Sequence, residues 1–76
     1  MDEEYLKNLA ALHDLSPRET QVFILLAQGR NRPFIQEDLG ISDGTVKTHA
    51  SRIYQKFGVG GKQQLLSVVF DGTGTD

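Results

Sequence analysis

The stretch ISDGTVKTHASRIYQKFG, residues 41–58, decides the fold. Ser42 is a residue type that caps the start of helices and Gly58 is a type that ends them, so a helix is predicted from residue 43 to residue 57. At about 100° per residue, four apolar side chains fall within one sector of this helix. They form its predicted buried stripe: Val46, Ala50, Ile53 and Phe57.

The opposite side of the same helix carries small or polar residues: Gly44, Thr48, Ser51 and Gln55. Lys47 and Arg52 flank them, and this outward face is predicted to hold no acid. Short side chains permit the close approach that a DNA groove requires, while Lys and Arg contact phosphates or guanine edges. This outward face fits the groove of duplex DNA. The helix alone leaves open the alternative that the face is only exposed to solvent.

Two further helices are predicted upstream. One covers residues 32–39, between Asn31 as its cap and Gly40 as its end, and only three residues separate it from the helix that follows. So short a connection is typical of a helix-turn-helix. An earlier helix begins at a capping box formed by Ser16 and Glu19, and Ile24 falls outside its predicted buried stripe.

The two ends of the chain are predicted to add one helix each. Residues 2–13 have the apolar spacing of a short linker helix that packs on the domain. Residues 62–70 carry apolar side chains over an arc of about 200°, wider than the roughly 100° that one core-facing side requires. We expect a second partner for that arc, with self-association preferred over contact with the N-terminal helix. The tail, residues 71–76, has no apolar anchor and is predicted to be disordered.

Composition limits the classes of function. The 76 residues suffice for one small domain and leave no room for a separate catalytic domain. The net charge of −2 divides into −3 over residues 1–15, +3 over 16–70 and −2 over 71–76, so acidic ends flank a basic centre. The chain has no cysteine, and no apolar run approaches the roughly 20 residues of a membrane span. We expect a cytoplasmic protein that is not an enzyme and has no metal or cofactor.

Four phased blocks carry a resemblance: LSPRE at 15–19, LLAQG at 25–29, ISDGTVKTH at 41–49 and IYQKFGV at 53–59. Together they closely resemble the LuxR-type (NarL/FixJ, GerE-like) helix-turn-helix domain, over about residues 15–69. The resemblance implies an all-α, four-helix DNA-binding domain, here residues 15–70, preceded by a linker helix within residues 1–14. Members of the family are mostly bacterial transcription regulators, including response regulators, that carry this domain at the C-terminal end of a longer chain.

The resemblance also implies roles for individual residues. Residues 43–57 become the recognition helix in the major groove, and His49 becomes a structural residue at the core edge, with a phosphate contact as the alternative. Pro33 and Phe34 stand where many members have a lysine, so Arg30 or Arg32 would supply that phosphate contact. The implied base contacts are Lys47, Thr48 and Ser51; the phosphate contacts are Arg30, Arg32, Thr45, Arg52 and Lys56; and the dimer contacts are Leu66, Val69 and Phe70.

The expected function is sequence-specific binding of double-stranded DNA by a homodimer, as the output domain of a regulator. The expected partners are RNA polymerase and a sensor or membrane domain elsewhere in a longer chain. The membrane domain is expected because the run GRNRPFIQ at 29–36 resembles regulators with a multi-span membrane part. The alternative is a helix-turn-helix used as a protein-docking module for polymerase, a sigma-like factor or its own sensor domain. The small positive excess and an exposed Ile24 would favour this alternative.

Overall fold

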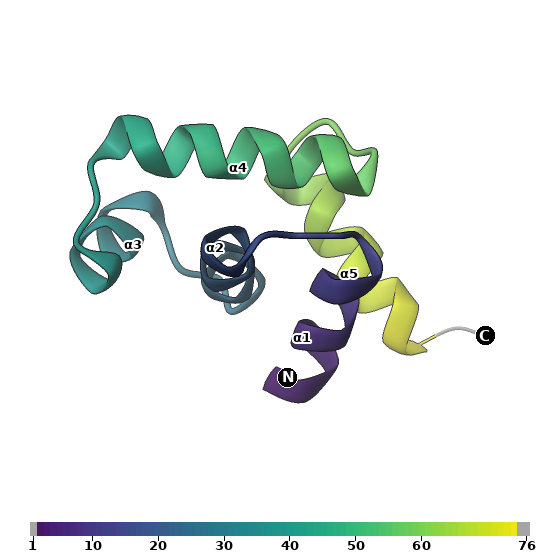
Figure 1. Ribbon diagram of the computed structural model, residues 1–76. Helices are drawn as coiled ribbons and strands as arrows, with labels where there is room; N and C mark the ends of the chain where they lie inside the picture. The colour runs from purple at the N-terminus through teal and green to yellow at the C-terminus, as the bar shows by residue number, and fades with distance from the viewer. Residues whose placement is uncertain (1, 75–76) are drawn as a thin grey trace.

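The structure, a computed structural model, describes residues 2–74 and the side chains of residues 2–71. The described part is all-α and contains five helices and no strand, which confirms the predicted fold class (Figure 1). In chain order the helices are α1 Glu3–Leu12, α2 Pro17–Ala27, α3 Arg32–Leu39, α4 Asp43–Phe57 and α5 Lys62–Gly74.

Local sequence signals set most helix boundaries. Ser16 and Glu19 form both bonds of the capping box, with the Glu19 amide donating to Ser16 Oγ at 3.1 Å and the Ser16 amide donating to Glu19 Oε1 at 2.9 Å. Gly40 and Gly58 end α3 and α4 with φ of 65° and 70°, in the left-handed region that favours glycine. These signals lie within a few residues of each boundary, which is why α4 has the bounds that the sequence predicts.

The last helix ends later than predicted. Its expected end is Phe70, but α5 continues to Gly74, so the predicted disordered tail begins too early. The final part of that predicted tail, residues 75–76, lies outside the described residues.

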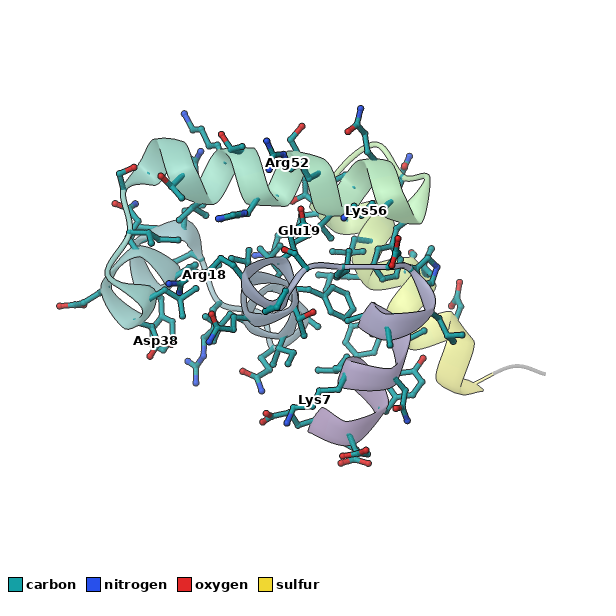
Figure 2. The ribbon with its side chains drawn as sticks, viewed as in Figure 1. Lys7, Arg18, Glu19, Asp38, Arg52 and Lys56 are labelled. Atoms are coloured by element: carbon teal, nitrogen blue, oxygen red, sulfur yellow. The ribbon has the colours of Figure 1, made fainter. Side chains whose placement is uncertain are left out.

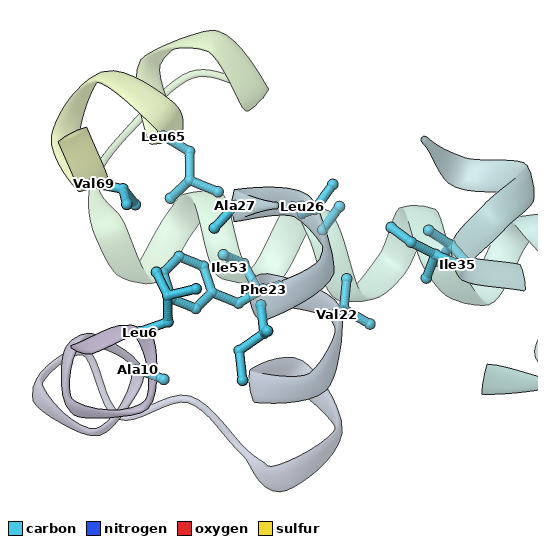
Figure 3. Packing of buried hydrophobic residues seen from close by; sticks show 13 residues of the cluster. Leu6, Ala10, Val22, Phe23, Leu26, Ala27, Ile35, Ile53, Leu65 and Val69 are labelled. Carbon is cyan, nitrogen blue, oxygen red and sulfur yellow. The ribbon is translucent and has the colours of Figure 1, made fainter. Parts of the chain in front are cut away.

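One apolar core joins all five helices. Each helix contributes at least one side chain that is fully buried: Leu6, Phe23, Ile35, Ile53 and Leu65. Leu6, Phe23, Leu65 and Val69 converge where α1, α2 and α5 meet (Figure 3). Because α1 supplies core residues, it is part of the same packing unit as the four helices that follow.

The arrangement leaves α4 along one side of the molecule. It lies across α2 and α3, while α5 packs on α2 and α4 and α1 packs on α2 (Figure 1). His13, just after α1, stacks on Phe57 near the end of α4 with ring centroids 3.8 Å apart, and Phe23 stacks on the same ring. These contacts pack the end of α4 against the core, so the outer side of the helix stays exposed.

Within the chain α5 packs against α2 and α4 and also touches α1. Tyr5 donates a hydrogen bond from its hydroxyl to the Val69 carbonyl at 2.8 Å, and the Val69 side chain is fully buried. The prediction that Val69 is a dimer contact is therefore wrong, because that side chain already packs inside its own chain. Contact with the N-terminal helix, the less favoured reading, accounts for this part of the apolar arc. No helix in the described residues is long and apolar enough to cross a membrane.

Candidate nucleic-acid interface

The outer side of α4 presents the residues that the sequence selected. Lys47, Thr48, Ser51 and Arg52 are all exposed. The Thr48 hydroxyl donates to the Gly44 carbonyl at 3.0 Å, so its methyl group and not its hydroxyl hydrogen faces outward. Beneath them Val46, Ala50 and Ile53 are buried, so the predicted division between an inner and an outer side is present.

The start of α4 joins the two helices of the motif. Ser42 caps it by accepting from the Thr45 amide at 3.2 Å, and the Ser42 and Thr45 hydroxyls are 3.0 Å apart. Thr45 therefore lies in the first turn, where the amides and the dipole of the helix favour an anion. This is the position predicted for its phosphate contact.

An acid borders the outer side, contrary to the expectation that this face holds none. Asp43 Oδ1 lies 3.6 Å from Arg32 Nε and accepts a hydrogen bond from Gln36 Nε2 at 3.2 Å. Its other oxygen, Oδ2, lies 3.5 Å from Lys47 Nζ. At about 100° per residue Asp43 falls nearer the buried stripe than the outward face, but its carboxylate reaches Lys47, which lies one turn further along the helix.

The predicted phosphate contacts fall into two groups. Arg30, Arg32 and Arg52 are exposed, although Arg30 lies over the Phe34 ring, 4.5 Å from its centroid, and Arg32 pairs with Asp43. Lys56 instead pairs with α2 and the segment before it, with its Nζ 2.8 Å from Glu19 Oε1 and 3.0 Å from the Asp14 carbonyl oxygen (Figure 2). The structure therefore gives Lys56 a structural role that its spacing did not predict.

The predicted structural residue His49 is half-buried. Its Nδ1 is buried and has no hydrogen-bond partner among the described residues. This placement is at the core edge, where the resemblance locates that residue.

A cavity of about 550 Å³ runs beside α4. Its apolar surface comes from Leu26, Val46 and Ala50, and the cations Arg32, Lys47 and Lys62 line it as well. No acid is among the described residues that line it. An apolar surface with cations around it can accommodate a sugar and a phosphate of a nucleic-acid backbone.

Lys62 and Tyr54 are among the lining residues of this cavity that were not predicted as site residues. Lys62 begins α5 and donates to the Arg30 carbonyl at 3.1 Å, which holds its ammonium beside the α2–α3 connection. Burial raises the pKa of the Tyr54 phenol, although the nearby Arg32 charge acts in the opposite direction, so the hydroxyl stays a neutral donor at pH 7. A wheel of α4 could have flagged Tyr54, but Lys62 comes from another helix, so no spacing in the sequence would reveal it.

Comparison with known proteins adds an independent finding. The family described as "Bacterial regulatory proteins, luxR family" matches residues 13–69. The chain is 44% identical over 52 residues to the spore germination protein GerE of Bacillus subtilis, covering 68% of this chain and 70% of that protein. No solved structure matches the chain significantly.

Longer relatives match over the same region. The probable transcriptional regulatory protein NarL of Mycobacterium tuberculosis is 44% identical over 45 residues, which is 59% of this chain and 21% of that protein. The transcriptional regulatory protein UhpA of Escherichia coli is 40% identical over 58 residues, 76% of this chain and 30% of that protein. The chain thus spans less than a third of these two regulators.

Proposed function

Because the chain belongs to the luxR family of bacterial regulatory proteins, we propose that it binds specific sequences in duplex DNA as the DNA-binding part of a transcription regulator. One observation carries the proposal: the outer side of α4 presents Lys47, Thr48 and Ser51 together, with nothing else in the described chain covering them. A helix exposed in this way fits the major groove, where its N-terminal residues reach base edges. The family is a DNA-binding regulator domain and is not known for catalysis.

Backbone contacts would orient α4 in the groove. Arg32, Lys62 and Tyr54 line the cavity beside the helix, and Thr45 and Arg52 lie along it, so phosphates on both sides of the groove find donors. Arg30 is a further candidate on the α2–α3 connection. We leave Lys56 out of this set, because the buried Glu19 holds its ammonium.

The test is selection of bound duplexes from a random library by the 76-residue chain. If each protomer neutralises three or four phosphates, log affinity for the selected duplex falls against log salt with a slope of roughly −3 per protomer. A flat salt response, or the absence of any selected duplex, would contradict the proposal.

A single substitution separates base contact from general attraction. Lys47→Ala is expected to weaken binding to the selected duplex more than to random duplex, because it removes both a charge and a base contact. Lys7→Ala is the matched control: it also removes one exposed ammonium, but on α1, far from α4 (Figure 2). Equal losses on selected and random duplex would demote Lys47 to a phosphate contact.

We also propose binding as a dimer to two half-sites. With Val69 buried, the remaining predicted contacts are Leu66 and Phe70, one helical turn apart on α5, and the Phe70 side chain is half exposed. A two-fold dimer implies an inverted repeat with half-site centres about 10 base pairs, or a multiple, apart. Sedimentation with the selected duplex should give two wild-type protomers per site and one for Phe70→Glu; one wild-type protomer per site would rule the dimer out.

The protein-docking alternative loses one of its supports. Ile24, predicted to be exposed, is only 9% exposed and belongs to the core cluster, so it offers no docking point. Contacts with RNA polymerase and with a sensor or membrane domain stay predictions. Capture of a protein partner, together with failure to select any duplex, would favour docking over DNA binding.

A further inference from the structure

Asp43 is the residue that the proposed function does not use. It lies in the first turn of α4, the part of a recognition helix that reaches base edges, and its side chain is 43% exposed. A carboxylate at this place repels phosphates and so weakens general attraction to DNA. General attraction to DNA therefore does not explain why an acid lies at this position.

Local stability is a weak reason. An acid in the first turn interacts favourably with the helix dipole, but Ser42 already caps this end by accepting from the Thr45 amide. The ion pairs with Arg32 and Lys47 have N···O distances of 3.6 and 3.5 Å between exposed groups, and pairs of this kind contribute little. Neither effect requires the acid to lie beside the base-contacting side of α4.

The orientation of the carboxylate is more informative. Gln36 and Arg32, both on α3, contact Oδ1, whereas Lys47 approaches Oδ2. The positioning helix therefore holds one oxygen and leaves the other paired with Lys47. At the start of α4 this places one strong acceptor and one strong donor side by side.

We propose that Asp43 and Lys47 together recognise one C·G base pair. The inference rests on the proposed function. In the major groove the N4 amino group of cytosine is a donor, and the O6 of the paired guanine, directly beside it, is an acceptor. The Asp43 carboxylate accepts from N4, and the Lys47 ammonium donates to O6 and N7. Asp43 and Lys47 thus give up their contact with each other and each binds the base pair instead.

The same chemistry ranks the four base pairs. The reversed G·C pair, and likewise T·A, places an acceptor against the carboxylate and is the worst fit. The A·T pair presents a donor and an acceptor in the favourable order, but adenine N7 lies beside its amino group and faces the carboxylate as a second acceptor. The expected preference at this position is C·G, then A·T, then G·C and T·A.

The experiment uses the duplex that the wild-type chain selects from the random library. All four base pairs are placed in turn at each position of a half-site, and Kd is measured. At one position the duplex with C·G should bind about ten-fold or more tightly than the duplex with G·C. This difference is within the range expected of a good side-chain pair. In Asp43→Ala that preference should vanish, while preferences at the other positions remain.

Two further variants complete the design. Asp43→Asn keeps the size of the side chain but removes its charge and replaces one acceptor oxygen by a donor that can also bind the reversed pair, so the preference for C·G should fall even if the alanine variant were poorly folded. Asp38→Ala removes one exposed acid from α3 and is the control for charge: it should strengthen binding to every duplex alike and change no base preference.

Different results would contradict the inference and the proposed function. If Asp43→Ala and Asp43→Asn keep the same base preferences as the wild-type chain, Asp43 is only a helix-start residue and the inference is overturned. If the wild-type chain selects no duplex at all, the proposed function itself fails, and the inference falls with it.

Discussion

Glu19 shows how one residue can serve two helices. Its carboxylate is almost fully buried, accepts from the Ser16 amide at the start of α2, and pairs with Lys56 near the end of α4 at 2.8 Å. The hydrogen bonds from Lys56 and Ser16 hold the pKa of Glu19 below its ordinary value of 4.5, against the opposing effect of burial. The capping box was predictable from four consecutive residues, whereas the pairing with Lys56 was not, because the partner lies in another helix.

The lowered pKa predicts a dependence of stability on pH. The ionised form of Glu19 stabilises the fold fully above the unfolded-state pKa of about 4.3, and this contribution disappears as the pH falls through the lower folded-state pKa. We therefore expect the free energy of unfolding, measured with urea, to fall below about pH 4. The fall should be smaller in Glu19→Gln than in Glu37→Gln, which alters an exposed acid. Identical pH profiles for these two variants would contradict the role of Glu19.

Removing the partner of Glu19 tests the role of Lys56. Lys56→Met leaves a buried carboxylate without its cation, so we expect a loss of about 2 kcal/mol in the free energy of unfolding, below the roughly 3–5 kcal/mol of fully buried pairs because the Lys56 side chain is 37% exposed. The salt dependence of DNA binding by the folded variant should not change. A slope smaller by about one would instead restore Lys56 as a phosphate contact.

Among the elements, α4 was the most predictable and α5 the least. The bounds and buried stripe of α4 follow from Ser42, Gly58 and periodicity, all of which are local. The burial of Ile24 depends on where α1 packs, because Glu3 and Ile24 line the same small hollow and the start of α1 lies beside α2. The burial of Val69 and the pairing of Asp43 with α3 likewise depend on contacts between helices, which no local pattern encodes.

The contribution of α1 to the core can be measured with one matched pair of variants. Leu6 is fully buried and Leu12, on the same helix, is 79% exposed. Leu6→Ala should lower the free energy of unfolding by about 2–4 kcal/mol because it opens a cavity in the core. Leu12→Ala should change it by less than about 0.5 kcal/mol. Equal effects in urea unfolding would mean that α1 is a detached linker and not part of the domain.

At the scale of the whole molecule, charge is separated in space as well as in sequence. The first turn of α1 carries Glu3 and Glu4, and it lies at the opposite side of the molecule from α4 (Figure 1). The positive excess belongs to residues 16–70. Removing residues 1–15 would be a poor test of this separation, since it would also remove the buried Leu6 and Ala10. Substitutions that keep α1 in place are the appropriate test.

The double variant Glu3→Gln, Glu4→Gln removes two negative charges and leaves the core intact. The Debye length is about 30 Å at 0.01 M salt and about 8 Å at 0.15 M, so charges on the side of the molecule opposite α4 reach the bound DNA much better at the lower salt concentration. We therefore expect tighter binding to random duplex at 0.01 M salt and unchanged binding at 0.15 M, measured by fluorescence anisotropy. The pair with Lys7 that this variant breaks is exposed and 3.7 Å long, so the thermal midpoint should hardly move. An equal gain at both salt concentrations would mean that the start of α1 lies next to the bound DNA, which would contradict the assignment of α4 as the element that faces it.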